Sequence, residues 1–388
     1  MKKIIFTVTN DLTYDRRMQR ICTSLSKADY DILLVGRKMN DSQPFDNQCF
    51  KSKRFNLIFN KGKFFYLEYN IRLFFWLLFQ RFDIVCAIDL DTIVPCFFTS
   101  ILRGGKTMVY DAHELFTEVP EVIRRPRIRK IWLGVERFIV PKLKHCYTVS
   151  QGVADEFERR YGVKFELIRN LPKRIANVAS ASAEPVSTAS AVVNLTATDK
   201  SVETGSDKSE AIILYQGSLN EGRGLEVAIE AMHDIDNAVL WLAGEGDLSG
   251  ILRGMVKEQK LDNKVKFLGY ILPDNLPNIT AQASIGLQIS EDKGLSYQLS
   301  LANKFLDYIQ AGVPQICTRF VEYQRLNEQY DIAILIEKTD KTLLTQAINR
   351  LLNDKTEYEK LKNNCFSAAK KLCWEEEEKR LIAFYYRL

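Results

Sequence analysis

The sequence is poor in the residues that build metal sites and disulfide frameworks. It contains three histidines, which do not cluster, and eight cysteines, which stand singly without a CxxC motif. This pattern predicts reduced thiols in a cytoplasmic protein and argues against a bound metal or a disulfide framework. We therefore expect no metal ion and no cofactor.

Long apolar runs and a strong bias of charge are also missing. The N-terminal MKKIIFTVTNDL turns polar after a few apolar residues, so it predicts a first strand and not a signal peptide. Of 388 residues, 46% are hydrophobic and 27% are charged, and the net charge is +5. These values are typical of a soluble globular protein of about two to three domains. No segment resembles a module that reads RNA or DNA, so nucleic acid is not an expected partner.

Patterns of buried strands alternate with helical patterns along the chain. Such alternation predicts parallel sheets covered by helices, which is the doubly wound α/β class. The expected strands lie at residues 3–8, 31–35, 83–88, 107–110 and 147–150 in the first half, and at 211–216, 239–243, 265–269, 283–289, 315–317 and 332–336 in the second.

A segment rich in Ala, Ser, Thr and Val separates the two halves. Residues 176–208 cannot bury enough apolar surface to offset the entropy of ordering the chain. We therefore predict an N-terminal domain at 1–172, a low-complexity linker or insertion at 173–210 and a C-terminal domain at 211–372. Residues 373–388 are expected to form a helix that packs back on the N-terminal domain.

The stretch SYQLSLANKFLDYIQAGVP, residues 296–314, predicts a short helix that begins near residues 301–304 and ends at the Gly-Val-Pro. A helix N-terminus exposes unpaired N–H groups, so Asn303 and Lys304 mark a candidate phosphate site. Asp307 lies one turn further on the same side, where a carboxylate could bind the hydroxyls of a ribose. The alternative is a buried helix with a solvated Lys/Asp pair.

A glycine-containing turn follows the expected strand at 211–216. It starts at Gly217 and Ser218 and reaches Arg223 just before a helical pattern. In such a turn the backbone N–H groups face a phosphate. The glycines alone are a weak signal, so this turn is only a second candidate for phosphate binding.

A polar cluster follows the expected strand at 107–110. In YDAHELF, Asp111, His113 and Glu114 are residue types that transfer protons in catalysis. A histidine just past a buried strand can equally be a structural residue whose hydrogen bonds are satisfied.

The loop after the first strand carries a further polar group. Asn10, Asp11, Asp15 and Arg16 lie at the carboxyl end of that strand, where parallel sheets bind ligands, and could line an acceptor pocket. A cap on the following helix is an equally good interpretation.

NKFLDYIQAGVP resembles the nucleotide-sugar signature of glycosyltransferase family 4. YDAHELF, TVSQGVA and RNLP also resemble segments of that family, so the resemblance covers most of the chain outside the linker. It implies two Rossmann-like doubly wound domains that face each other across a cleft, the GT-B fold. It also implies a retaining, metal-independent glycosyltransferase of the hexosyltransferase type that uses a nucleotide-diphosphate sugar.

The resemblance assigns donor contacts residue by residue. The family has two glutamates eight positions apart, and Asp307 matches the second, at the donor ribose, whereas Leu299 takes the place of the first. An Arg and a Lys bind the diphosphate in the family. Here Ser218 replaces the Arg and Arg223 matches the Lys, so one charge is lost unless Lys304 restores it.

The resemblance also gives His113 a contact with the transferred sugar. Asp111 or Glu114 would then orient His113 or meet the acceptor hydroxyl. The loops that flank the nucleobase in the family correspond to Gly244 with Glu245 and to Tyr270 with Ile271.

Two segments of the N-terminal domain combine apolar side chains with other features of membrane surfaces. FFYLEYNIRLFFWLLFQRF, residues 64–82, falls short of the ~20 clean apolar residues of a spanning helix and predicts either a core helix or an interfacial one. Residues 124–144 are strongly basic with interleaved aromatics, which favours an anionic membrane surface. We expect a glycan or lipid-linked acceptor in cell-surface polysaccharide assembly, on the inner face of a bacterial cell membrane.

Two other functions fit the same sequence. A sugar-nucleotide epimerase shares the architecture and the diphosphate site but needs no acceptor. A catalytically degenerate subunit would bind a membrane partner without turnover, and Leu299 and Ser218 are the residues that favour it.

Overall fold

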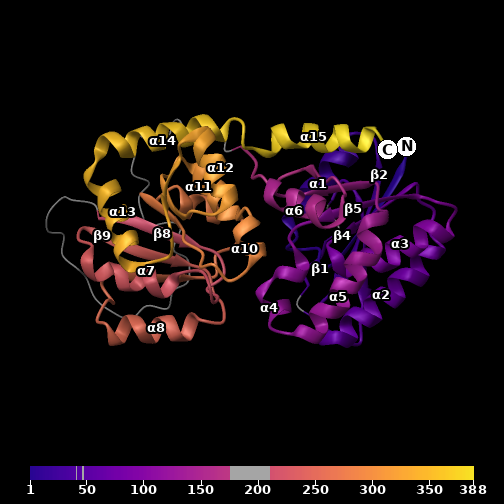
Figure 1. Cartoon of the computed structure of the whole chain (residues 1–388), viewed down its shortest axis with the longest axis horizontal. Helices are drawn as coiled ribbons and strands as arrows, with labels where there is room; N and C mark the ends of the chain where they lie inside the picture. Colours follow the sequence, from indigo (N-terminus) through magenta and orange to yellow (C-terminus); the bar gives the residue numbers. More distant parts are fainter. Residues whose placement is uncertain (41, 46–47, 175–209) are drawn as a thin grey trace.

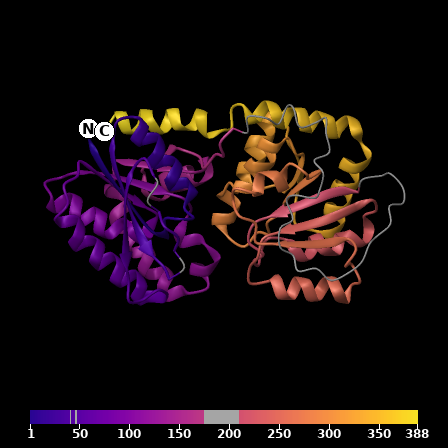
Figure 2. The ribbon, with the colours of Figure 1, turned by 180° about the vertical axis from the view of Figure 1, so that it is seen from behind.

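Two parallel β-sheets, one in each half of the chain, organise the computed structural model, which describes residues 1–40, 42–45, 48–174 and 210–388. Figures 1 and 2 show the halves as two lobes side by side, connected at one end by the chain and by α15. The linker predicted at 173–210 falls almost entirely on residues 175–209, outside the described residues.

The first sheet has the strand order β3-β2-β1-β4-β5-β6-β7, and all of its pairs are parallel. Its strands are β1 Lys3–Asp11, β2 Asp31–Lys38, β3 Lys51–Asn56, β4 Ile84–Ile88, β5 Thr107–Ala112, β6 His145–Thr148 and β7 Glu166–Leu167. The helices of this half are α1 Arg16–Lys27, α2 Gly62–Leu78, α3 Ile93–Leu102, α4 Pro120–Ile123, α5 Pro126–Ile139 and α6 Gln151–Tyr161, with short 3-10 turns η1 Leu90–Thr92, η2 Phe116–Glu118 and η3 Val140–Lys142.

The second sheet repeats the arrangement with the order β10-β9-β8-β11-β12-β13. Its strands are β8 Ala211–Gln216, β9 Ala238–Ala243, β10 Val265–Gly269, β11 Ile285–Gln288, β12 Gln315–Thr318 and β13 Ala333–Ile336. Its helices are α7 Leu225–Ala231, α8 Ser249–Glu258, α9 Leu276–Thr280, α10 Leu295–Leu299, α11 Asn303–Ala311, α12 Val321–Tyr330, α13 Lys341–Asn353 and α14 Lys355–Ala369, with a 3-10 turn η4 Met232–Asp234, and α15 Trp374–Tyr386 ends the fold.

The strand order reverses at one point in each sheet, between β1 and β4 in the first and between β8 and β11 in the second. Ligands of doubly wound sheets bind at this point, outside the carboxyl ends of the strands. The polar loops singled out after β1, β5 and β8 lie at these ends. The predicted class of two doubly wound domains is therefore confirmed.

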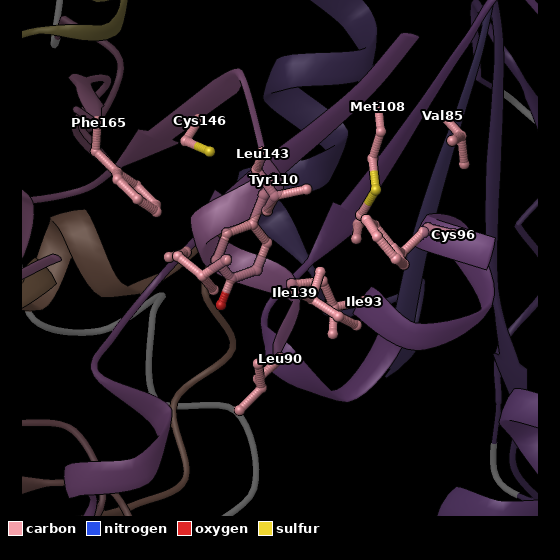
Figure 3. Packing of buried hydrophobic residues seen from close by; sticks show 14 of the residues in the cluster. Val85, Leu90, Ile93, Cys96, Met108, Tyr110, Ile139, Leu143, Cys146 and Phe165 are labelled. Carbon is pink, nitrogen blue, oxygen red and sulfur yellow. The ribbon is translucent and has the colours of Figure 1, made fainter. Parts of the chain in front are cut away.

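The first sheet is buried on both faces, which explains its nearly continuous apolar strands. Successive residues of β1 alternate between two cores: Ile4 and Phe6 pack with α1 and α15, and Ile5 packs on the opposite face. Figure 3 shows part of that second core, where Val85 and Tyr110 of β4 and β5 lie near α3 and the end of α5.

The helix α15 returns to the first domain. Its Phe384 and Tyr385 are buried in the core beside β1, and the Trp374 indole N–H donates to Ser24 Oγ of α1 at 2.9 Å. The Trp374 backbone N–H donates to the Pro172 carbonyl at 2.8 Å, so the chain leaving the first domain and the chain returning to it run against each other. Figure 1 shows α15 lying across the first lobe.

Five polar contacts join the two domains, and all come from loops or helix starts at the carboxyl ends of strands. These ends of the two sheets therefore face each other. The contacts are Arg16 with Asp274 at 2.9 Å, Arg124 with Glu221 at 2.8 Å, Asn170 with Asn303 at 2.9 Å, Ser150 Oγ with the Leu299 carbonyl at 2.6 Å and the Gly152 N–H with Glu322 Oε1 at 2.7 Å.

The helix α2 is both a core helix and an exposed apolar one. Phe65, Tyr69, Leu73 and Leu77 pack into the first core. The outward side is apolar as well, because Phe64, Leu67, Ile71 and Phe75 remain between 47% and 58% exposed. Both interpretations of residues 64–82 thus apply to different sides of one helix. Among the described residues, no helix has the length and apolar character needed to cross a membrane.

Candidate donor and catalytic site

The loops after β8 and β9 lie against each other at the carboxyl edge of the second sheet. The Gly217 N–H donates to the Ala243 carbonyl at 2.9 Å. Gly244 has a φ of 149°, and a side-chain carbon there would lie 1.9 Å from the Gly217 carbonyl oxygen. Only glycine allows this approach, which brings the predicted diphosphate loop beside a predicted nucleobase loop.

The Lys304 ammonium lies over this loop. It sits 3.6 Å from the centre of the Tyr215 ring, and a side-chain carbon at Gly217 would be 3.6 Å from its Nζ. Lys304 is in the first turn of α11, which starts at Asn303 and has no side-chain cap from Ala302. An ammonium and uncapped N–H groups therefore lie in the same first turn.

The second predicted cation lies close to the first. The Arg223 guanidinium stacks over the Tyr297 ring at 4.7 Å. Burial and then the charge of Arg223 hold the pKa of Lys304 well below its usual range. In the described part of the chain, neither cation forms an ion pair with a carboxylate. This edge of the sheet therefore carries positive charge that is not neutralised.

Asp307 faces the first domain. Gln216 Nε2 donates to Asp307 Oδ2 at 2.9 Å, and Thr280 Oγ1 donates to Gln216 Oε1 at 2.7 Å, so a short chain of hydrogen bonds fixes the carboxylate. Burial raises the pKa of Asp307 to about 6, while the charge of Arg20 opposes the rise. Arg20 belongs to α1, where it contacts the Asn170 side chain and lies 5.7 Å from the Trp374 ring centre.

Three residues near α11 have other surroundings than predicted. The Asn303 side chain accepts from Asn170 Nδ2, so it joins the domains. Ser218 is exposed, and its backbone carbonyl accepts from the Tyr215 hydroxyl at 2.9 Å. Leu299, at the position of the family's first glutamate, packs on the first domain, where a side-chain carbon at Gly152 would lie 2.9 Å from Leu299 Cδ2.

His113 has both ring nitrogens engaged. Arg17 Nε lies 2.9 Å and Asp111 Oδ2 lies 3.1 Å from His113 Nε2, while Nδ1 is 3.4 Å from Asp89 Oδ2. Burial lowers the pKa of His113, but the carboxylates of Asp89 and Asp111 raise it more, to about 9. The imidazole is therefore protonated at neutral pH and donates to the two carboxylates.

Asp111 cannot meet an acceptor hydroxyl as predicted. Its side chain is fully buried and binds the Arg17 guanidinium, with Nη2 at 3.0 Å from Oδ1. Burial raises its pKa, but Arg17 and His113 outweigh burial and lower it. Only the predicted orienting role is compatible with this burial.

Glu114 and Asp91 are the carboxyls with pKa values near neutrality. Burial, and next the charge of Asp89, raises the pKa of Glu114 to about 7. Burial and Asp89 do the same for Asp91, whose Oδ2 accepts from Thr9 Oγ1 at 2.5 Å. A carboxyl with such a pKa exchanges protons readily at neutral pH, which suits a residue next to an acceptor hydroxyl.

The acceptor-pocket prediction for the loop after β1 is not supported. Asp15 Oδ1 accepts from the Met18 N–H at 3.1 Å, so the helix-cap alternative is confirmed for Asp15. Asp11 accepts from the Thr13 N–H and from Ser42 Oγ. The remaining two are also engaged, since Asn10 donates to Asp15 at 3.3 Å and Arg16 pairs with Asp274.

The predicted nucleobase residues lie at the edge of β9 and β10. Glu245 pairs with Arg253 at 2.5 Å, and its carbonyl accepts from the Leu219 N–H at 3.2 Å. Tyr270 is 63% exposed, whereas Ile271 packs against the core under α11. A nucleobase contact for these residues stays a prediction.

The sequence-based prediction missed four residues that shape the site: Gln216, Tyr215, Arg17 and Arg20. Gln216 and Tyr215 end a buried strand immediately before Gly217, which is a local signal for a ligand contact. Arg17 and Arg20 lie one turn apart on α1 and have no such signal, because their partners come from distant segments.

Two family models match the chain, and between them they cover most of it. The model described as "Glycosyltransferase Family 4" matches residues 15–173, and the model described as "Glycosyl transferases group 1" matches residues 197–370. This chain belongs to the glycosyltransferases of the family 4 type. The family expected from NKFLDYIQAGVP is therefore confirmed.

Solved glycosyltransferase structures share the fold over the full chain. Sucrose-phosphate synthase from Thermosynechococcus elongatus has a TM-score of 0.78 at 15% identity, with coverage of 100% of this chain and 99% of that one. Anabaena HepE in complex with UDP-glucose has a TM-score of 0.74 at 13% identity, with both chains fully covered. WaaG, a glycosyltransferase involved in lipopolysaccharide biosynthesis, has a TM-score of 0.69 at 13% identity over 98% of this chain and 99% of that one. The predicted GT-B fold is confirmed.

A curated relative matches a shorter stretch. It is an uncharacterized glycosyltransferase of Methanocaldococcus jannaschii, 24% identical over 187 residues. The match covers 47% of this chain and 46% of that protein, which is under half of the relative's length.

Proposed function

We propose that this glycosyltransferase moves a hexose from a nucleoside-diphosphate donor, with Lys304 and Arg223 binding the diphosphate and Asp307 binding the ribose. The observation that carries the proposal is the meeting of two cations without carboxylate partners beside Gly217. A diphosphate supplies the negative charge that this edge lacks. The UDP-glucose bound by the HepE structure, which shares the fold, supports a donor of this class.

The same two cations would promote departure of the nucleoside diphosphate. Negative charge grows on the leaving oxygen as the glycosidic bond breaks, and fixed cations in a partly buried site stabilise that charge. This chemistry needs no metal ion, and among the described residues no group of three or more His, Cys, Asp or Glu is arranged to hold one. Metal independence is tested by transfer in the presence of a chelator.

Retention of the anomeric configuration is proposed from the family resemblance. In this proposal the charged His113 network holds the floor of the sugar site, and Glu114 meets the acceptor hydroxyl, because its carboxyl has a pKa of about 7 and no hydrogen-bond partner in the described chain. The configuration of the product, read by NMR, tests retention directly.

We further propose a lipid-linked glycan as the acceptor, used at the inner face of the cell membrane during polysaccharide assembly. The exposed apolar side of α2 continues on α3 with Ile101 and Leu102 and on α5 with Ile131. Basic side chains of α5 surround this surface, a combination that suits anionic lipid, at about 1 kcal/mol per cation. The role of WaaG in lipopolysaccharide biosynthesis is compatible with such an acceptor.

Donor binding by charge-removal variants tests the proposal. With UDP-glucose and UDP as probes in calorimetry, Lys304→Ala and Arg223→Ala should each weaken binding about tenfold or more, because a hydrogen bond to a charged group contributes about 1.5–3 kcal/mol. Lys257→Ala, at an exposed cation of the same domain, is the control. Unchanged affinity in both site variants contradicts the assignment. Binding without hydrolysis or transfer would instead favour a subunit that has lost turnover.

A further inference from the structure

A hollow of about 350 Å³ lies on the first domain between α4 and α5, away from the donor loops' own residues. We call it the α4–α5 groove. Its walls combine apolar and basic side chains, and its lining residues are Ile123, Pro126, Arg129, Lys130, Leu133, Gly134 and Arg137.

The groove has cations that are free to bind an anion. Lys130 and Arg137 are exposed and form no ion pair with a carboxylate in the described chain, whereas Arg129 is held by Glu118 at 2.8 Å. Lys130, Gly134 and Arg137 follow each other at spacings of four and three, so they lie on one side of α5. Gly134 leaves the space between the two cations open, because nothing lies within 4 Å of a side-chain carbon there.

One end of the groove adjoins the donor loops. Arg124, next to Ile123, pairs with Glu221 of the loop after β8 at 2.8 Å. Ile123 Cδ1 would lie 3.2 Å from a side-chain carbon at Gly294, which precedes α10. An acceptor held in the groove would therefore have its reactive end near the proposed sugar donor.

The other end adjoins the exposed apolar surface. Phe138 of α5 packs edge to face on Phe97 of α3, with ring centres 6.3 Å apart, and is itself 52% exposed. Phe98 and Ile101 of α3 continue the apolar surface. Figure 1 shows α4, α5 and α2 in this order from the interdomain side outward.

We propose that the α4–α5 groove binds the phosphate of an acceptor that carries an apolar tail, with Lys130 and Arg137 on the phosphate and the tail directed toward α3. This inference rests on the proposed lipid-linked acceptor. Two cations spaced along a helix side match a phosphate, and the adjoining apolar surface has no use for a free phosphate ion. A nucleic acid is disfavoured, because the lining residues include no aromatic ring for base stacking.

Binding of three small probes separates the sources of affinity. Octyl phosphate below its micelle concentration, octanol and inorganic phosphate are titrated into the full chain by calorimetry. Octyl phosphate should bind at least tenfold more tightly than either of the other two, because only it uses both parts of the groove. Equal affinity for inorganic phosphate would overturn the assignment of an apolar tail.

Variants locate the binding site. Lys130→Ala/Arg137→Ala should weaken octyl phosphate binding tenfold or more and leave UDP-glucose binding unchanged, whereas Lys355→Ala/Lys371→Ala, at exposed cations of α14 and its end, should leave both unchanged. Gly134→Leu should fill the groove without altering charge and also abolish binding. It should fold, since the site is open and leucine favours a helix over glycine.

The outcomes distinguish this inference from the proposed function. Octyl phosphate binding that survives Gly134→Leu, or that falls equally in the α14 control, overturns the groove. A variant that loses only anionic vesicles, and keeps octyl phosphate, also overturns it, because its cations then act on the membrane surface alone. Failure of the wild type to bind UDP-glucose refutes the donor proposal instead and leaves the octyl phosphate result standing.

Discussion

At the scale of single residues, the Lys304 ammonium is a group whose placement destabilises the free protein. Burial and the charge of Arg223 lower its pKa, and no carboxylate compensates it in the described chain. Lys304→Met keeps the length and removes the charge, so it should raise the thermal midpoint of the ligand-free protein, by about 1 kcal/mol of unfolding free energy. UDP affinity should fall in the same variant. A lowered midpoint, measured by calorimetry, would contradict the unpaired state of this cation.

The depressed pKa of Lys304 also predicts proton uptake on donor binding. A diphosphate beside the ammonium favours the charged form, so the pKa rises in the complex and a proton is taken from solvent. At pH 8 the heat of UDP binding should therefore depend on the ionisation enthalpy of the buffer. Lys304→Met should lose that dependence, and equal heats for the wild type in phosphate and Tris would refute the coupling.

His113 should make stability depend on pH. Its pKa is about 9 in the folded protein against 6.5 in a model peptide, mainly because the carboxylates of Asp89 and Asp111 outweigh the effect of burial. Since the folded value is the higher one, the stabilisation is complete below pH 6.5 and is lost as the pH rises to about 9. His113→Gln should therefore destabilise the protein more at pH 6 than at pH 9, by up to about 3 kcal/mol in urea unfolding. The same loss at both pH values would argue against a charged imidazole.

At the scale of elements, the buried strands and α11 could be predicted, because apolar runs and helical spacing are local properties. The helix expected to begin near residues 301–304 starts at Asn303, which fixes Lys304 and Asp307 on one side of it. The strand β3 was missed, since KSKRFN at a sheet edge is polar and mostly exposed. The contacts of Asp307 with Gln216 and with the charge of Arg20 come from three different elements, and no local pattern encodes them.

The double character of α2 predicts separate effects of substitutions on its two sides. Leu67→Ser/Phe75→Ser changes the exposed side, so binding to anionic vesicles should fall severalfold in co-sedimentation while the thermal midpoint changes little. Leu73→Ser changes the buried side and should lower stability by about 2 kcal/mol or more.

The matched control for the exposed side is Val321→Ser, at an exposed apolar residue of the other domain, and it should leave vesicle binding intact. If the α2 double variant sediments with vesicles as the wild type does, this surface faces something other than a membrane.

At the scale of the whole molecule, the two-domain fold followed from the family resemblance, but the way the domains meet did not. The position of the missing glutamate, Leu299, contacts Gly152 across the interface, and the Gly152 N–H donates to the buried carboxylate of Glu322. A prediction from the missing acid alone pointed to lost chemistry. The structure instead shows an apolar interdomain contact at this position.

This interface leads to a prediction for transfer as distinct from donor binding. A side-chain carbon at Gly152 would lie 2.9 Å from Leu299 Cδ2 and 3.3 Å from Glu322 Oε1, so Gly152→Val should force the domains apart. UDP affinity should hold, because the proposed diphosphate site lies within the second domain, while sugar transfer should fall at least tenfold. Gly134→Ala, with open space around it, is the control, and equal losses of binding and transfer would contradict the separation.

The return of α15 to the first sheet has a consequence for biosynthesis. Phe384 and Tyr385 complete the hydrophobic core around β1, although some 370 residues of sequence separate them from that strand. A nascent chain on the ribosome therefore cannot close its N-terminal lobe when that lobe emerges. It must wait until the polypeptide has been synthesised and released as far as residue 385, and the half-built lobe is the species that chaperones would meet.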